Sequence, residues 1–171
     1  MIRNNMFEIF YPKECVDSTY RIDFPSLYRQ GYRGILFDID NTLVPHGAPA
    51  TRQARALFEE LRRIGFHTCL ISNNQEPRVK PFADAVGSLY ICDAHKPSVK
   101  NYKKAMELMG TDIKNSLFIG DQLFTDVYGA NRADMYTILV KPIHPKEEIQ
   151  IVLKRYLEKI VLWEYKRKKS V

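Results

Sequence analysis

Residues 35–46 read ILFDIDNTLVPH and place two carboxylates, Asp38 and Asp40, at the end of an apolar run. The run has the continuous hydrophobicity of a strand that is buried on both faces of a sheet. A buried carboxylate without a partner is costly, and two neighbouring carboxylates repel each other. The stretch therefore predicts a central strand whose exit faces a cation.

The remainder of the chain alternates between short apolar runs and amphipathic segments. The patterns predict strands at residues 32–39, 66–72, 88–92, 116–120 and 136–140. They predict helices at residues 25–30, 51–64, 76–86, 98–109, 122–133 and 146–164. Buried strands that alternate with helices are typical of a parallel sheet covered on both faces. We therefore predict an α/β fold with a single Rossmann-like, doubly wound parallel sheet of about five strands.

The composition is that of a soluble globular chain, with 45% hydrophobic and 27% charged residues. The sequence shows neither a signal peptide nor an apolar run of the ~18 residues that cross a membrane. The three cysteines are far apart in the chain, which disfavours disulfides and a zinc site, and we expect a cytoplasmic protein. The net charge of +6 is concentrated in residues 146–171, which argues against a broad nucleic-acid-binding face.

Polar side chains follow four of the predicted strands. They are Asp38, Asp40, Asn41 and Thr42, then Ser72, Asn73 and Asn74, then Lys96, and last Asp121, Gln122, Thr125 and Asp126. Each group alone is compatible with a turn or a helix cap. In parallel sheets, however, strand ends meet at one edge, so together they predict one site. Carboxylates suit Mg²⁺, and a cation with a lysine can offset the negative charge of a phosphate under attack.

The stretches DIDNTL, SNN, KP and GDQLFTD resemble the four signature motifs of phosphatases of the haloacid dehalogenase (HAD) superfamily. Over residues 10–150 the chain resembles the YqeG-type branch of the class IIIA phosphatases, which is related to phosphatidylglycerophosphatases. The resemblance implies a phosphomonoester hydrolase that uses Mg²⁺. The acid at position 40, which can donate a proton, favours a phosphatase over a dehalogenase.

The resemblance also implies catalytic roles. Asp38 is expected to be the nucleophile, to form an aspartyl-phosphate and to bind Mg²⁺. Asp40 is expected to be the general acid and base, with its backbone carbonyl toward the metal. Lys96 is expected to bridge Asp38 and the phosphate.

The remaining motif residues are expected to hold the substrate and the metal. Thr42 braces the first motif, while Ser72 and Asn73 form the phosphate site with it. Asp121 is the further metal ligand, and Asp126 supports the site by orienting Lys96 or a metal-bound water.

The chain has no room for a cap domain, because residues 41–71 and 75–95 each hold only one helix and short connections. We therefore expect a capless, open site that accepts a large substrate, or one whose lid comes from a second subunit. His46 follows the first motif, and an exposed loop residue is favoured there over a contact with the leaving group.

We assign residues 1–145 to the catalytic core with an N-terminal extension, and residues 146–171 to an amphipathic helix with a basic tail. The apolar face of that helix comprises Ile149, Val152, Leu153, Tyr156, Leu157, Ile160 and Trp163. Covering the core is favoured for it, and peripheral contact with anionic lipid at the inner face of the membrane is the alternative. Phosphatidylglycerol phosphate is the leading substrate. A soluble sugar or nucleotide phosphate, and a non-catalytic partner- or RNA-binding module, are the other hypotheses.

Overall fold

The structure, a computed structural model, describes residues 7–144 and 149–169, the side chains of 149–153 excepted. Its centre is one sheet of six parallel strands in the order β1-β6-β5-β2-β3-β4. The strands are β1 Glu14–Val16, β2 Gly34–Phe37, β3 His67–Ile71, β4 Leu89–Ile91, β5 Ser116–Gly120 and β6 Tyr136–Val140. Since β2 pairs with both β3 and β5, the strand order reverses at β2, and a ligand site is expected at its C-terminal end.

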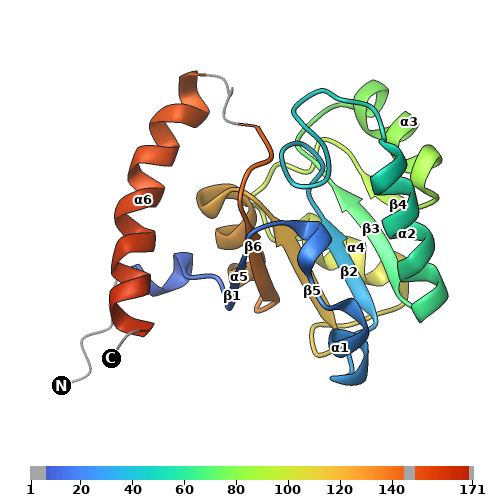
Figure 1. Ribbon diagram of the computed structural model, residues 1–171, viewed down its shortest axis with the longest axis horizontal. Coiled ribbons are helices and arrows are strands. Elements are labelled where there is room, and N and C mark those ends of the chain that lie inside the picture. Colours follow the sequence, from blue (N-terminus) through green and yellow to red (C-terminus); the bar gives the residue numbers. More distant parts are fainter. Residues whose placement is uncertain (1–6, 145–148, 170–171) are drawn as a thin grey trace.

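Helices cover both faces of this sheet (Figure 1). They are α1 Phe24–Arg29, α2 Arg52–Ile64, α3 Glu76–Val86, α4 Lys100–Met109, α5 Tyr128–Arg132 and α6 Ile149–Lys169. Short 3-10 turns η1 and η2 occupy Glu8–Phe10 and Thr19–Arg21, and the π-helical turn η3 occupies Leu123–Val127. The sheet is therefore doubly wound, as predicted.

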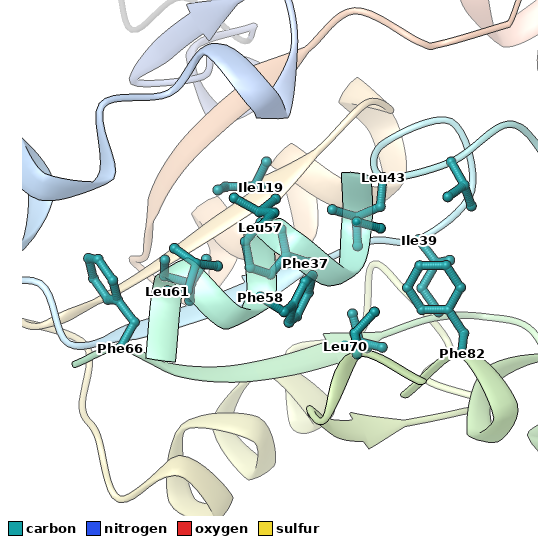
Figure 2. Packing of buried hydrophobic residues seen from close by; sticks show 14 of the residues in the cluster. Phe37, Ile39, Leu43, Leu57, Phe58, Leu61, Phe66, Leu70, Phe82 and Ile119 are labelled. Atoms are coloured by element: carbon teal, nitrogen blue, oxygen red, sulfur yellow. The ribbon is translucent and has the colours of Figure 1, made fainter. Parts of the chain in front are cut away.

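Alternate side chains of β2 enter two different hydrophobic layers. Phe37 packs with residues of α1, α2 and α3, including Phe58 and Phe82, and Figure 2 shows this layer. Leu36 faces the opposite side and packs with α4 and α5 residues such as Tyr102. Burial on both faces explains why the strand reads as one continuous apolar run.

The structure differs from the prediction at two elements, and two predictions are untested. Strand β1 was not predicted, because its three residues carry no periodic signal and its partner β6 lies more than a hundred residues away. The predicted helix 122–133 begins instead as a π-helical turn, and only Tyr128–Arg132 is α-helical. The predicted start of the last helix and the division at residues 145/146 lie outside the described residues.

Helix α6 lies beside the β1–β6 end of the sheet, away from α2 and α3 (Figure 1). Its side chains toward the protein are Glu158, Val161 and Tyr165, all less than 9% exposed. The favoured role for its apolar face is wrong where the side chains are described, because Tyr156, Leu157, Ile160 and Trp163 are 55–63% exposed. Within the described part of the chain, no helix combines the length and hydrophobicity needed to cross a bilayer.

Candidate active site

Acidic side chains from two strand ends meet a buried lysine at the C-terminal edge of the sheet. Asp38 follows β2, and Asp121 and Asp126 follow β5. Each of these three carboxylates offers an oxygen within 4.8 Å of the others. The ammonium of Lys96, which follows β4, lies 2.6 Å from Asp38 Oδ1 and 2.7 Å from Asp126 Oδ1. The structure thus brings together residues up to 88 positions apart, as the strand-end pattern predicts.

Burial controls the charge of this cluster. Desolvation, with the neighbouring Asp126 charge, raises the pKa of Asp38 to about 7, although Lys96 opposes that rise. Desolvation together with the charge of Asp38 also raises the pKa of Asp121. Burial acts to lower the pKa of Lys96, but the charges of Asp126 and Asp38 outweigh it and hold the lysine protonated. The site therefore carries excess negative potential that one lysine does not fully offset.

The cluster fits a hard divalent cation. All three donors are carboxylate oxygens, and Mg²⁺ takes oxygen ligands at about 2.0–2.1 Å in an octahedron. Such an octahedron places its oxygens about 3–4.2 Å apart, which is near the observed spacing. Asp126, predicted as a supporting residue, belongs to this side-chain group with Asp38 and Asp121. The contribution predicted for Asp40 is its backbone carbonyl, which remains a prediction.

Thr42 is buried, and its hydroxyl contacts two carboxylates. Its hydroxyl lies 3.0 Å from Asp121 Oδ1 and 3.4 Å from Asp38 Oδ2. At 1% exposure it has little surface to offer a substrate, so its predicted bracing role agrees better with this position than substrate binding does. The hydroxyl of Thr19 donates to the Thr42 carbonyl at 2.8 Å, and Tyr20 donates to the next carbonyl. The N-terminal extension therefore holds the loop after β2.

The segment after β3 organises two other parts of the site. Ser72 is 2% exposed and accepts a hydrogen bond from the backbone N–H of Asn74. The Asn73 side chain accepts from the Lys96 backbone N–H at 2.7 Å and donates to the Lys96 carbonyl at 3.3 Å. Asn73 therefore fixes the lysine's backbone, and a direct substrate contact for it remains a prediction.

The Asp40 side chain is held by three donors. Arg78 Nη2 and the Gly47 N–H donate to its Oδ1 at 2.7 Å and 2.8 Å. The Asn74 side chain donates to Oδ2 at 2.7 Å. Sequence reasoning missed Arg78, which lies on α3 after the second motif, because nothing in its local pattern distinguishes it from a solvent-facing helix residue.

We expect Arg78→Met to lower kcat for phosphate monoesters by about 10–100-fold with little change in KM. The reason is that the Asp40 carboxyl would lose its ion pair with Arg78 and a fixed orientation, while the phosphate-facing groups would stay in place. Steady-state kinetics check this, and Arg78→Lys should recover part of kcat. A change confined to KM would contradict a positioning role.

The catalytic pocket has a volume of about 230 Å³. Its lining combines Asp38, Asp40, Ser72 and Lys96 with the exposed His46 and, from α6, Lys154. His46 is an exposed loop residue, as expected, and it also lines the pocket. Lys154 was not assigned to the site, because its contribution depends on how α6 docks. No domain is inserted between the motifs, yet α6 supplies part of one wall.

The neighbouring Arg155 makes the contact that attaches α6 to the site. Its guanidinium donates to the backbone carbonyl and to the Oδ2 carboxylate oxygen of Asp121. It also lies 3.0 Å from Glu158 Oε2, and Glu158 accepts from the Leu123 N–H at 2.7 Å. The helix therefore places a cation on a predicted metal ligand.

Comparisons with known proteins agree with this geometry. A family profile described as HAD-hydrolase-like matches residues 94–148. The chain is 36% identical over 162 residues to a Bacillus subtilis protein named probable phosphatase YqeG, covering 94% of each chain. The chain belongs to the YqeG family of HAD phosphatases. It is thus an enzyme of the phosphatase class, and the non-catalytic hypothesis is not supported.

Two more distant proteins extend the comparison. Phosphatidylglycerophosphate phosphatase 1 of Arabidopsis thaliana is 26% identical over 168 residues, which are 92% of this chain and 48% of that protein. A cobalt-bound deoxy-D-mannose-octulosonate 8-phosphate phosphatase from Haemophilus influenzae superposes with a TM-score of 0.51 at 13% identity, covering 65% of this chain and 69% of that one. The second likeness supports the fold alone.

Proposed function

We propose that this protein hydrolyses phosphate monoesters through an aspartyl-phosphate on Asp38, with Mg²⁺ as cofactor. The observation that carries the proposal is the contact of Asp38 with the buried Lys96, inside a cluster of three carboxylates. A carboxylate that attacks an anionic phosphate meets repulsion of about 4 kcal/mol for each pair of charges at ~4 Å and an effective dielectric near 20. Lys96 offsets part of that repulsion at the nucleophile itself.

In this proposal, Asp38 and Asp40 carry out the hydrolysis in two steps with one water molecule. An oxygen of Asp38 bonds to phosphorus while the bond from phosphorus to the leaving oxygen breaks, and Asp40 gives that oxygen its proton. Asp40 then takes a proton from water, and the water oxygen bonds to phosphorus. The bond between phosphorus and Asp38 breaks, which releases inorganic phosphate and restores the carboxylate.

Asp38, Asp121 and Asp126, with the Asp40 carbonyl, are the groups that would hold Mg²⁺. When bound, the ion would supply positive charge to the oxygens of the transferring phosphoryl group. Thr42 keeps two of these carboxylates in position, and Arg78 with Asn74 keeps Asp40 aimed at the pocket.

We further propose that the substrate is a membrane lipid phosphate, and phosphatidylglycerol phosphate is the preferred candidate. The named activity of the Arabidopsis relative favours this substrate. The exposed apolar side chains of α6, beside Lys159 and Arg167, have the composition of a helix that rests on anionic lipid. A soluble sugar or nucleotide phosphate remains the competing substrate class.

The direct experiment measures release of phosphate from 4-nitrophenyl phosphate and from phosphatidylglycerol phosphate in mixed micelles. Each reaction is run with Mg²⁺ and with a chelator. The proposal expects turnover that requires the cation and a kcat/KM that is higher for the lipid than for a panel of soluble phosphates. Turnover of a soluble phosphate alone would assign the competing substrate class.

We expect Trp163 fluorescence to report the membrane contact, since Trp163 is the only tryptophan and is 62% exposed. Vesicles that contain phosphatidylglycerol should shift its emission to shorter wavelength, whereas neutral phosphatidylcholine vesicles should not. Ile160→Glu should abolish the shift because it places a charge on the apolar face. Leu108→Glu, at an exposed leucine of α4, is the matched control and should leave the shift intact.

A further inference from the structure

A second cavity of about 410 Å³ lies between α6 and the β1–β6 edge of the sheet. Its apolar lining includes Val16 of β1, Leu139 of β6 and Leu162 of α6, and the thiol-bearing Cys15 also lines it. The volume lies in the range of small-molecule sites, which are mostly apolar with a few placed charges. The proposed catalytic residues Asp38, Asp40 and Lys96 do not line this groove.

The groove adjoins the catalytic pocket. Asp121 and Arg155 line the groove, whereas the residues next to them in the chain, Gln122 and Lys154, line the catalytic pocket. The ion pair between Arg155 and Asp121 therefore lies where the two linings adjoin. A molecule that fills the groove has one end beside a predicted metal ligand.

The charges of the groove favour an anionic molecule. Its acidic side chains are all paired with cations: Asp17 with Lys141, and both Asp121 and Glu158 with Arg155. Lys159 and Lys166 of α6 add two further positive charges to the lining. The groove thus combines an apolar interior with a net positive wall, which suits an amphiphile with an anionic headgroup.

The position of the groove on α6 makes it accessible to an amphiphile from a membrane that contacts the exposed face of the helix. At about 100° per residue, the groove residues 159, 162 and 166 lie between two faces of the helix. On one side is the buried face of Glu158, Val161 and Tyr165, and on the other is the exposed apolar face that includes Trp163. An acyl chain that leaves a membrane under the exposed face meets the groove next.

We propose that this groove binds an acyl chain of an amphiphilic phosphomonoester, with Lys159 countering the charge of its headgroup while the monoester reaches Asp38. This inference rests on the proposed function and deepens it, because it assigns substrate selection to a site outside the catalytic motifs. The groove explains how a capless pocket of about 230 Å³ recognises a lipid without a lid.

The first test uses a substrate that is monomeric in water, so that membrane binding plays no part. We compare dihexanoyl phosphatidylglycerol phosphate with 4-nitrophenyl phosphate. Leu162→Trp, which fills the groove, should lower kcat/KM for the lipid by about tenfold and leave that for the aryl phosphate unchanged. Leu108→Trp, at an exposed leucine of α4, should change neither. Equal effects of Leu162→Trp on both substrates, or none, would overturn the proposal.

The second test needs no turnover. Cys15 lines the groove, Cys69 is buried, and a Cys92→Ser background leaves Cys15 as the accessible thiol. The dihexanoyl lipid should slow alkylation of Cys15 by N-ethylmaleimide, and inorganic phosphate should not. Protection of Cys15 without hydrolysis of any substrate would support lipid binding in the groove and contradict the proposed reaction. Hydrolysis of the lipid without protection of Cys15 would contradict lipid binding in the groove and support the proposed reaction.

Discussion

Replacing Asp38 with asparagine is expected to lower kcat for every phosphomonoester by about 10⁴-fold or more, because the amide cannot form the aspartyl-phosphate. The measurement is phosphate release under single-turnover conditions, where residual activity is separated from product release. Asp84→Asn, an exposed acid on α3, is the matched control and should retain full activity. Activity of Asp38→Asn within tenfold of the unaltered protein would contradict the assignment of the nucleophile.

The same variant should be more stable than the unaltered protein when no metal is present. Asp38 has its pKa raised from 3.8 to about 7 on folding, so the folded state holds a proton that the unfolded state has lost between these values. Stability therefore falls as pH rises through this window, and the loss is complete above pH 7. Asparagine cannot ionise, and its gain, on the order of a few kcal/mol, should appear above pH 7 and vanish below pH 4. Urea unfolding at pH 4 and pH 8 checks the sign.

A gain in stability together with a loss of activity would separate the chemical role of Asp38 from misfolding. It would also show that the active site stores unfavourable electrostatic energy, which a bound cation relieves. A lower stability of Asp38→Asn at pH 8 would mean that the Lys96 contact outweighs the burial cost.

The sequence was sufficient for the elements whose signal is local. Helix Glu76–Val86 and strands Ser116–Gly120 and Tyr136–Val140 have the predicted bounds, since a continuous apolar run marks each strand, and Pro77 and Gly87 mark the ends of the helix. Thr51 caps α2 as predicted, by accepting from the Ala54 N–H at 3.1 Å. Strand ends of a parallel sheet meet by geometry, so the gathering of the motif residues also followed.

Contacts between elements could not be predicted from the sequence. Arg78 lies 38 residues from Asp40, and Arg155 lies 34 residues from Asp121, so no spacing rule connects either pair. The apolar residues of α6 share a helical face, but periodicity cannot say whether that face meets the core or solvent. The helix docks through Arg155 and Glu158 together with Val161 and Tyr165, and this leaves the predicted apolar face exposed.

Replacing Lys96 with methionine is expected to reduce the free energy of unfolding more than any of the other substitutions. The variant keeps Asp38, Asp121 and Asp126 buried together and removes the cation that lies within 2.7 Å of two of them. Breaking a buried ion pair on one side typically costs about 3–5 kcal/mol, which for a chain of this size lowers Tm by on the order of 10 °C. Calorimetry of the metal-free protein at pH 8 measures the change.

The pH and metal dependence of that loss identify its cause. Without Lys96, the pKa of Asp38 in the folded state rises further above 3.8, so the folded variant loses stability as pH rises and the deficit is larger at pH 8 than at pH 5. The proposed function has Mg²⁺ bind the folded cluster and not the unfolded chain, so millimolar Mg²⁺ should restore part of the Tm. Lys100→Met, the same change at an exposed position on α4, controls for the lost charge and should move Tm little at either pH. A Lys96→Met variant as stable as this control at pH 8 would mean that the carboxylates are neutralised by other groups, and that the lysine acts on the phosphate alone.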